Sequence, residues 1–547
     1  MINIGIDFGS TYTMVSVYEK GKGVPVTVQP DGLSYSYPSI VVYDSRRDRY
    51  ICGKAARSRV GGKDTVTYRG FKMLLNQQMS EENLALRGYD KVNTPEKITE
   101  EFLRYVIQNT LDKKGESKVG TLVIGAPECW FQSIQTVDAR GTLREICRKM
   151  PNLVEEVKII SEPTNAAAFC VWNYEQQFHE PLNGRILVVD YGGGTLDTAL
   201  VNVRQQKGQM QIKPEMRSGA GENHDNKIGE AGIAFQEAVA RRAISEALDI
   251  PGDSIPYDAH FNQFLKDFEE QLLSQSDYVS QSMQEFSFAP DGLRDITLCG
   301  LTYDGEPVDI DLYQLYSCYQ EHIHPVLQRV LDETTTDLKD PKNLRIALVG
   351  GFCNFYLVRK QIYDYFKIAQ IDDRTKGMIR EEAQRETAIA HGAALFADNV
   401  LSVCNIAQFS IGTYATYPDG RRFNRFAINY GQEIEPDQIY FALDDRGEPF
   451  PMTSGSIDKF LLNFGRKSST AIDVQPKPEF AAQLQSVPCG MVVVIGFSMD
   501  ACDRITVHVF NYDIEHARRD PKPTASLPLS TLKDMFESIV LTGLGGS

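Results

Sequence analysis

Two stretches of this 547-residue chain repeat one pattern, in which an apolar strand ends in an aspartate, a glycine- and threonine-containing turn follows, and a second strand returns. The first copy covers Ile2–Asp7 and Met14–Tyr18, and the second covers Arg185–Asp190 and Asp197–Val203. Each copy predicts a β-hairpin. Because a repeated unit points to repeated architecture, the pattern favours a duplicated α/β fold.

The turns of these hairpins are suited to a nucleotide triphosphate. The chain has no G-x-x-x-x-G-K-[ST] sequence, which excludes a lysine-bearing phosphate loop. Glycine N–H groups in two facing turns can approach phosphate oxygens closely. Asp7 and Asp190 could hold a hydrated Mg²⁺, because this hard cation keeps several of its waters. A third glycine pair, Gly350-Gly351, follows the apolar strand Leu344–Val349 and would let a ring lie against the backbone.

In order along residues 1–400, these segments resemble the actin, sugar-kinase and heat-shock ATPase superfamily, and within it the seventy-kilodalton heat-shock (DnaK-type) chaperone family. The resemblance rests on two phosphate loops, two connecting stretches and an adenosine loop: Gly5–Thr13, Asp190–Asp197, Ile159–Ala168, Glu386–Ala394 and Val349–Phe352.

The resemblance implies ATP or ADP as ligand, with Mg²⁺ positioned through water by Asp7 and Asp190. The phosphate contacts that it implies are Gly9, Ser10, Thr11, Tyr12, Gly192, Gly193, Gly194 and Thr195. The catalytic residues that it implies are Lys72, Glu162, Thr195 and Asp197. The remaining nucleotide contacts that it implies are Gly350, Gly351, Phe352, Asn354 and Glu386.

Two of these residues have a plainer interpretation when they are considered alone. Lys72 has the local context of a surface lysine, and only the resemblance places it near the γ-phosphate. Glu162 stands before a proline and could simply cap the helix that follows.

The chain departs from the family in the adenine clamp. The family carries an acid, a Lys-Arg pair and a serine along one helix, whereas the nearest match here is Asp267, Glu270, Gln271 and Ser274. Phe352 or Phe355 could stack on the base instead of the family's arginine. These changes predict weaker nucleotide affinity or an altered base preference.

The expected fold is a two-lobed actin-like ATPase with duplicated ribonuclease H-like sheets and flanking helices, followed by a mostly β C-terminal domain. The nucleotide-binding domain is expected over residues 1–400, with lobe I at about 1–183 and 370–400 and lobe II at about 184–369. The β-rich domain is expected over 405–547, as a client-binding domain without a helical lid.

Further elements follow from hydrophobic periodicity and end signals. The expected helices are Thr94–Lys114, Ile134–Lys149, Gly232–Leu248, Ala259–Met283, Ile310–Glu333, Phe355–Phe366, Glu381–Val400 and Thr531–Val540. The expected further strands are Gly120–Ala126, Val492–Phe497 and Arg504–Phe510, and the tail Thr542–Ser547 is expected to fray.

Charge and cysteine content narrow the class of protein. A net charge of −16 without a basic block argues against nucleic-acid and membrane-surface partners. The ten scattered cysteines include no C-x-x-C, which fits a reducing compartment better than a disulfide scaffold. Asp7 interrupts any N-terminal signal peptide, so we expect a cytoplasmic protein.

The expected function is a slow, Mg²⁺-dependent ATPase of chaperone type, whose nucleotide state controls binding of a client polypeptide or dedicated protein partner, with co-chaperones as further partners. One alternative is a nucleotide-gated interaction or filament-forming module with weak hydrolysis, which the altered clamp favours. A less favoured alternative is a small-molecule kinase, for which no substrate-binding base is evident.

Overall fold

The structure is a computed structural model with two compact units, Met1–Cys129 with Thr142–Ser402, and Trp130–Gly141 with Val403–Ser547. The described residues are 1–31, 34–76, 79–131, 139–206, 208–221, 230–335, 344–367, 379–380, 386–407, 410–416, 422–436, 438–443, 447, 449, 451–453, 460–463, 472–474, 492–499, 505–511 and 525–528.

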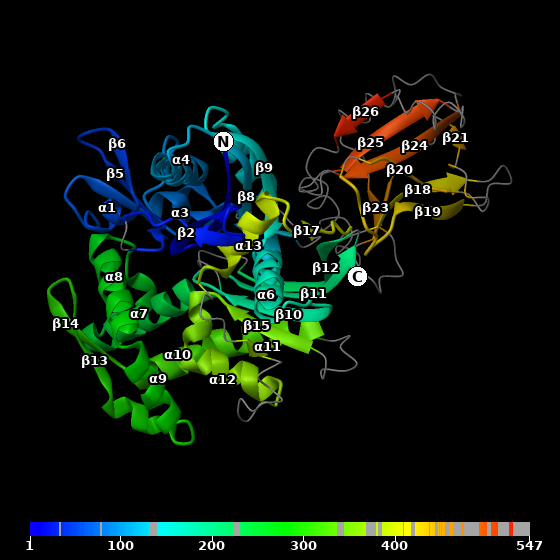
Figure 1. Ribbon diagram of the computed structural model, residues 1–547. Coiled ribbons are helices and arrows are strands. Elements are labelled where there is room, and N and C mark those ends of the chain that lie inside the picture. Colours follow the sequence, from blue (N-terminus) through cyan, green and yellow to red (C-terminus); the bar gives the residue numbers. More distant parts are fainter. Residues whose placement is uncertain are drawn as a thin grey trace. The chain divides into compact units, whose positions relative to one another are not determined.

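The first sheet of the first unit has the strand order β3-β2-β1-β8-β9. Its strands β2, β8 and β9 are labelled in Figure 1. The expected hairpin is present as β1 (Ile2–Phe8) and β2 (Tyr12–Glu19), which pair antiparallel. Strand β8 (Val119–Ala126) then pairs parallel with β1, and β9 (Val154–Ser161) pairs parallel with β8. Two short strands complete the sheet beside β2: β3 (Val24–Thr27) and β4 (Tyr37–Pro38).

The second sheet repeats this arrangement. Strands β10 (Gly184–Tyr191) and β11 (Leu196–Gln206) form the second expected hairpin, and β15 (Leu344–Val349) pairs parallel with β10. The sheet continues on one side with β12 (Gln209–Ala220), which sequence analysis missed, and on the other with β16 (Ile379–Arg380). Each sheet therefore places an antiparallel hairpin beside a parallel strand, which confirms the predicted duplication.

Two smaller sheets were not predicted. Strands β5 (Ile40–Asp44), β6 (Arg49–Cys52) and β7 (Thr65–Arg69) form one of them, in the order β6-β5-β7. Strands β13 (Thr297–Tyr303) and β14 (Glu306–Asp311) form the other. Short helices follow the strands of the first of these sheets in the chain. Helix α1 (Gly53–Arg57) follows β6, and α2 (Phe71–Leu74) and α3 (Glu81–Leu86) follow β7.

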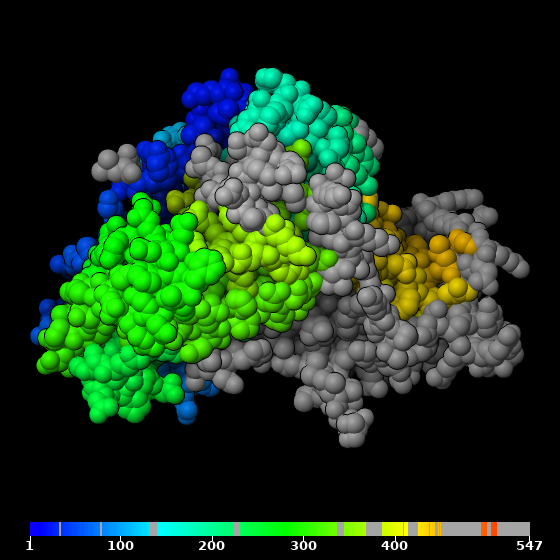
Figure 2. Space-filling view, turned by 90° about the horizontal axis from the view of Figure 1, so that it is seen from below, coloured from blue at the N-terminus to red at the C-terminus, as the bar shows by residue number. Residues whose placement is uncertain are grey.

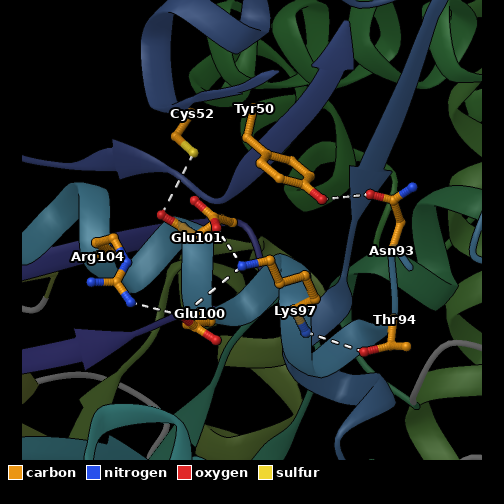
Figure 3. Close-up of polar contacts among 8 residues, drawn as sticks. All are labelled: Tyr50, Cys52, Asn93, Thr94, Lys97, Glu100, Glu101 and Arg104. Carbon is orange, nitrogen blue, oxygen red and sulfur yellow. Dashed lines mark hydrogen bonds and ion pairs between the residues drawn. The ribbon is translucent and has the colours of Figure 1, made fainter. Parts of the chain in front are cut away.

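Helix α4 (Pro95–Lys114) forms as its end signals predict. The Oγ1 atom of Thr94 accepts a hydrogen bond from the backbone N–H of Lys97 at 3.2 Å, which satisfies a donor of the first turn (Figure 3). Lys97 also pairs with Glu101 at 2.6 Å, one turn further along the helix. Gly115 ends the helix in the left-handed conformation, with φ of 66°.

Helices α6 (Glu162–Phe178) and α13 (Ala388–Ala397) pack against each other, and α13 also packs against β1, β2 and β8. The approach is at backbone distance. A Cβ on Gly392 would overlap the carbonyl oxygen of Asn165, and one on Gly5 would overlap the backbone nitrogen of Ala394. Of the helix predicted over Glu381–Val400, the described residues form a helix over Ala388–Ala397, and residues 381–385 lie outside the described part.

The remaining helices of the first unit are α5 (Ala139–Arg148), α7 (Gly232–Leu248), α8 (Ala259–Ser274), α9 (Ser276–Glu285), α10 (Leu312–Cys318), α11 (His324–Thr335) and α12 (Tyr356–Tyr365). The 3₁₀ turns are η1 (Glu128–Phe131), η2 (Gly252–Ser254), η3 (Pro290–Asp295) and η6 (Gly351–Asn354). In the view from below, the green residues that include most of these helices form a continuous surface (Figure 2).

Two predicted long helices are interrupted. The helix predicted over Ala259–Met283 breaks at Gln275, which separates α8 from α9. The prediction over Ile310–Glu333 is wrong at its start, because β14 extends to Asp311 and this residue caps α10 through a capping box with Gln314. A π-helical turn, η4 (Tyr319–Ile323), then joins α10 to α11.

The π-helical turn positions one buried aromatic side chain. The Tyr319 hydroxyl lies 2.5 Å from Oε1 of Gln361 and 3.1 Å from the carbonyl oxygen of Leu357. Its ring also packs edge-on against Phe355, with ring centroids 6.0 Å apart. The turn is therefore held against α12 by hydrogen bonds and by ring packing.

The second unit is mostly β in its described residues. One sheet has the order β19-β18-β22-β23, from Arg422–Ile428, Ser410–Thr416, Phe460–Asn463 and Ile472–Val474. The other has the order β20-β24-β25-β26, from Tyr440–Phe441, Val492–Met499, Ile505–Asn511 and Ala525–Pro528, with β21 (Pro451–Thr453) beside β24. Strand β17 (Ser402–Val403) lies at the boundary between the units. The helix predicted near Thr531–Val540 and the tail Thr542–Ser547 lie outside the described residues.

Two further observations concern the described part of the chain. The eight cysteines that it contains form no disulfide. No described helix combines the length and the apolar character needed to cross a bilayer.

The contact between α13 and α6 predicts an intolerant glycine. Gly392→Ala is expected to lower the free energy of unfolding by about 1–3 kcal/mol, because the added methyl group meets backbone that cannot rotate away. Chemical denaturation of the full chain measures the loss. Gly21→Ala is the matched control, since a Cβ there has no atom within 4 Å. Equal denaturation midpoints for the two variants would contradict the packing argument.

Candidate functional site

The turns of the two repeated hairpins lie against each other. A Cβ on Gly193 would overlap the hydroxyl of Thr11, and one on Gly194 would overlap the hydroxyl of Ser10 and lie 2.6 Å from Sδ of Met73. Side chains at these two positions would therefore force the turns apart. The contact brings together the two phosphate loops that the sequence places almost two hundred residues apart.

Hydrogen bonds from neighbouring elements hold each turn. The Ser39 hydroxyl donates to the carbonyl oxygen of Gly9 at 2.7 Å, and its backbone N–H donates to that of Thr11 at 2.8 Å. At the second turn, the N–H of Ile233 at the start of α7 donates to the carbonyl oxygen of Gly193 at 2.6 Å. Carbonyl oxygens of both turns therefore accept hydrogen bonds from neighbouring elements. Ser39 and Ile233 were not among the predicted site residues.

Three aspartates lie at the ends of the hairpin strands that are next to the turns. Asp7 is in β1 and keeps part of its surface accessible, whereas Asp190 and Asp197 face each other across β10 and β11 at 4% and 0% exposure. Burial, and then the nearby Glu162, raises the pKa of Asp7 to about 8, although Lys72 acts in the opposite direction. Burial, with Glu162 next, also raises the pKa values of Asp190 and Asp197 well above their ordinary range.

Lys72 and Glu162 form a buried ion pair beside these aspartates. Both are almost inaccessible, at 2% and 5% exposure. Burial lowers the pKa of Lys72, but Glu162 and then Asp7 raise it by more, so the charged ammonium group is favoured. The structure thus contradicts the interpretation of Lys72 as a surface lysine.

Local backbone explains how both partners reach this position. Gly70 adopts a left-handed conformation, with φ of 62°, and turns the chain from β7 into the short buried helix α2 that carries Lys72. Glu162 is the first residue of α6, directly after β9, and Ser161 rather than Glu162 is the N-cap residue. The alternative role of Glu162 as a simple cap therefore does not hold.

A second buried ion pair lies behind Asp197. The backbone N–H of Cys129 donates to Oδ1 of Asp197 at 3.2 Å, and the preceding residue, Glu128, pairs with Nε of Arg217 at 3.1 Å. Glu128 contributes to the raised pKa of Asp197. Sequence analysis missed Glu128 and Arg217, because they lie in separate segments and match no motif.

The adenosine loop leaves space beside its second glycine. Gly350, with φ of 81°, packs against Asp190 and Tyr191, where a Cβ would lie 2.6 Å from Oδ1 of Asp190. A Cβ on Gly351 would have no atom within 4 Å. Phe352 stacks on Phe355 with an interplanar angle of 8° and centroids 5.6 Å apart. The two aromatic side chains predicted to replace an arginine therefore lie together at this loop.

The helix that matches the adenine clamp contacts the first phosphate loop through a different cation. Arg57 donates from Nη1 to the Tyr12 hydroxyl at 2.7 Å, and its Nη2 lies 3.4 Å from Glu270. The Tyr12 hydroxyl also lies 3.3 Å from Glu269. Of the other clamp positions, Asp267 accepts from Gln263, Gln271 donates to Cys299, and Ser274 donates to Gln271.

Two predicted nucleotide contacts, Glu386 and Asn354, are exposed. Glu386 is exposed just before α13, and the described residues give it no hydrogen bond or ion pair. Asn354 is exposed at the end of η6. Neither residue makes a hydrogen bond or an ion pair with the phosphate loops in the part of the chain that the structure describes.

The chemistry of the buried oxygens fits a hydrated magnesium ion. Oδ2 of Asp190 and Oδ2 of Asp197 are buried without a hydrogen-bond partner among the described residues. Carboxylate oxygens are the ligands that Mg²⁺ prefers. Within the same residues, no three His, Cys, Asp or Glu side chains cluster closely enough to chelate an ion directly.

A comparison with known protein families covers the segments that form this site. The family model described as Hsp70 protein matches residues 3–411. The chain belongs to the Hsp70 family. This membership confirms the predicted fold class, an actin-like ATPase fold with duplicated sheets followed by a mostly β region.

Individual relatives are distant. The chain is 27% identical over 365 residues to the chaperone protein DnaK of Mycoplasmoides gallisepticum, which covers 66% of this chain and 55% of that one. It is 24% identical over 422 residues to DnaK of Carsonella ruddii, covering 72% and 62%. It is 31% identical over 228 residues to DnaK of Mycoplasma mycoides subsp. mycoides SC, covering 41% and 34%. The chain thus spans little more than half the length of the first two relatives.

The raised pKa of Asp7 predicts a pH-dependent stability of the chain without metal or nucleotide. Because the folded-state pKa of about 8 exceeds the ordinary value of 3.8, the contribution of Asp7 is fully present below pH 3.8 and is lost as the pH rises through 8. The melting temperature is expected to fall between pH 6 and 9, and to fall less in Asp7→Asn.

Thermal unfolding at both pH values measures this difference. Asp253→Asn, at an exposed carboxylate of η2, is the control and should behave like the unaltered chain. A slope in Asp7→Asn as steep as in the unaltered chain would contradict the assignment.

Proposed function

We propose that this chain binds and slowly hydrolyses ATP with Mg²⁺, and that its nucleotide state controls the binding of a client polypeptide. The observation that carries the proposal is the junction of the two glycine turns, with three aspartates and the Lys72–Glu162 pair beside it. We also propose a domain boundary at about residues 400–405, with a two-lobed nucleotide-binding domain before it. We further propose that the protein is cytoplasmic.

Backbone groups of the turns would hold the phosphates. The N–H groups of Gly9–Tyr12 and Gly192–Thr195 would donate to phosphate oxygens, because glycine lets the backbone approach them closely. Gly351 and Phe352 would take the adenosine, since open space lies beside Gly351. Ser10, Thr11 and Thr195 would add hydroxyl donors.

Asp7 and Asp190 would hold Mg²⁺ through its waters, and the ion would neutralise charge that develops on the phosphate oxygens. The chain's own side chains would contribute to hydrolysis by positioning the reactants and stabilising charge. The Lys72 ammonium group would donate to the γ-phosphate. Glu162 would orient the attacking water, and Asp197 would accept its proton, which its buried, negatively charged surroundings favour.

The catalytic assignment predicts a large rate loss in Lys72→Met. Removing one pre-organised cation is expected to lower the rate of ATP hydrolysis by about 100- to 1000-fold. Single-turnover hydrolysis of radiolabelled ATP by the full chain, with Mg²⁺ and with EDTA, measures the effect. Lys113→Met, at an exposed lysine of α4, is the matched control.

Because Lys72→Met leaves Glu162 buried without its partner, the double variant Lys72→Met/Glu162→Gln is also needed. It is expected to fold at least as well as the single variant and to be equally inactive. Hydrolysis within about threefold of the unaltered rate in the folded double variant would remove both residues from catalysis. No Mg²⁺-dependent hydrolysis in the unaltered chain would remove the enzyme proposal.

The proposed coupling predicts that ATP weakens client binding. A fluorescently labelled unfolded polypeptide is expected to bind the full chain about 5- to 150-fold more tightly with ADP than with ATP, the usual range of coupling between two sites. Fluorescence anisotropy measures both affinities. Asp190→Asn is expected to bind the polypeptide equally with either nucleotide. Equal affinities in the unaltered chain would contradict the coupling.

A second candidate is a nucleotide-gated interaction or filament-forming module with weak hydrolysis. The observation that favours it is the clamp helix α8, which presents Asp267, Glu270 and Gln271 without the family's cations. Light scattering with ATP and with ADP would detect filaments. Small-molecule kinase activity remains the less favoured alternative, tested by sugar-dependent transfer of phosphate.

A further inference from the structure

Asp197, the proton acceptor in the proposed hydrolysis, is held from one side by backbone. Its Oδ1 atom accepts a hydrogen bond from the backbone N–H of Cys129 at 3.2 Å, whereas its Oδ2 atom is buried without a partner among the described residues. A carboxylate that is held through one oxygen presents the other in a fixed direction. The contact with Cys129 therefore determines where the second oxygen of Asp197 points.

A glycine in the neighbouring strand makes room for this contact. Gly219 of β12 pairs with Asp197 of β11 in the sheet. A Cβ on Gly219 would lie 2.9 Å from Oδ1 of Asp197 and 3.1 Å from the backbone nitrogen of Cys129. Both distances are shorter than an ordinary van der Waals contact. The donor, the acceptor and the strand therefore fit together without spare room.

The residue before Cys129 is tied to the same strand by an ion pair. Glu128 is completely buried, and its Oε1 atom lies 3.1 Å from Nε of Arg217, whose side chain is 13% exposed. Arg217 lies two residues before Gly219, the partner of Asp197. Directly paired residues, and residues two apart in a strand, have their side chains on the same face of a sheet. The ion pair is therefore on the face of the sheet that carries Asp197.

This ion pair also joins the two sheets of the first unit. Glu128 follows β8 of the first sheet, and Arg217 belongs to β12 of the second. A buried ion pair is costly to form, because both charges lose most of their contact with water, and apolar side chains would fill the same space at lower cost. A need to fix the backbone at Cys129 relative to β12 accounts for a directional pair at this place.

We propose that Glu128 and Arg217 are positioning residues for ATP hydrolysis. Their ion pair holds the N–H of Cys129 against Oδ1 of Asp197, so that Oδ2 faces the attacking water. The inference rests on the proposed function, because it concerns the same hydrolysis step. The pair is expected to affect the rate of that step rather than nucleotide affinity, since it belongs to none of the loops assigned to the nucleotide.

Two measurements on the full chain with Glu128→Ala test the proposal. Hydrogen exchange at the Cys129 amide, followed without nucleotide by mass spectrometry with electron-transfer fragmentation, is expected to become at least about tenfold faster, because a hydrogen bond to a charged group is weakened. Single-turnover hydrolysis at saturating Mg²⁺ and ATP is expected to slow about 100-fold, the usual effect of a misplaced catalytic group. The calorimetric Kd of a non-hydrolysable ATP analogue is expected to stay within about threefold.

Two further variants separate positioning from a general loss of stability. Glu215→Ala is the matched control, because Glu215 is also on β12 and forms an ion pair with Arg185 of β10 at 2.8 Å. It should leave the exchange at Cys129 and the rate of hydrolysis unchanged. Glu128→Gln keeps a side-chain oxygen that can accept from Arg217, and is expected to retain slow exchange and normal hydrolysis.

The double variant Glu128→Leu/Arg217→Met keeps the test decisive if Glu128→Ala does not fold. Replacing a buried ion pair with apolar side chains often preserves stability, but it removes the directional contact. Fast exchange at Cys129 and slow hydrolysis are expected in this variant.

Normal exchange at Cys129 in Glu128→Ala or in the folded double variant would overturn the proposal. Hydrolysis within about threefold of the unaltered rate in either of them, or a loss confined to ATP affinity, would also overturn it. Because the exchange measurement needs no nucleotide, it decides whether the pair holds Cys129 even if the unaltered chain does not hydrolyse ATP. That second result would contradict the proposed function.

Discussion

The confinement of negative charge at the junction of the two hairpins is the constraint on which the rest of the site depends. Asp190, Asp197 and Glu162 share one buried region with Lys72, and the partly accessible Asp7 interacts with Glu162 and Lys72 beside them. Removing carboxylates from water is costly, and each one raises the pKa of its neighbours. The arrangement holds in the folded chain because protons, the lysine or an added cation compensate the charge. A region that needs external positive charge is suited to a metal-bound polyanion.

Close backbone contact makes this confinement possible. Gly193 and Gly194 admit the hydroxyls of Thr11 and Ser10, and Gly350 admits the carboxylate of Asp190. Gly5 and Gly392 let α13 approach the first sheet and α6 in the same way. Where side chains are absent, the two sheets can present their strand ends to one another. The spacing of the charged groups is therefore determined by backbone rather than by flexible side chains.

The elements that sequence predicted well are those with strong local signals. Both hairpins, α7 and β15 follow from apolar periodicity and from glycine or cap residues at their ends. The elements that it missed or misjudged depend on tertiary context. Strand β12 is stabilised by pairing with β11, and Ile310 and Asp311, which the sequence prediction placed at the start of a helix, instead pair within β14.

The same division applies to the site. The turn residues and aspartates were predictable because strand ends position them directly. The burial of Lys72 was not, since it depends on Gly70 turning the chain and on Glu162 arriving from a distant helix. Glu128, Arg217 and Arg57 carry no local signal, because each matters only through its partner. A single sequence therefore gives little information about charge pairs between separate segments.

The π-helical turn between α10 and α11 has a consequence for how this chain can vary. A π turn accommodates one residue more than a regular helical turn. Deleting a single residue from Tyr319–Ile323 would therefore convert the π turn into a regular helical turn, and the side chains of α11 would keep their directions. Val330 and Leu331 would stay in the core. The same deletion within α11 would instead rotate every later side chain by about 100°, so this turn is the place where the segment can lose one residue.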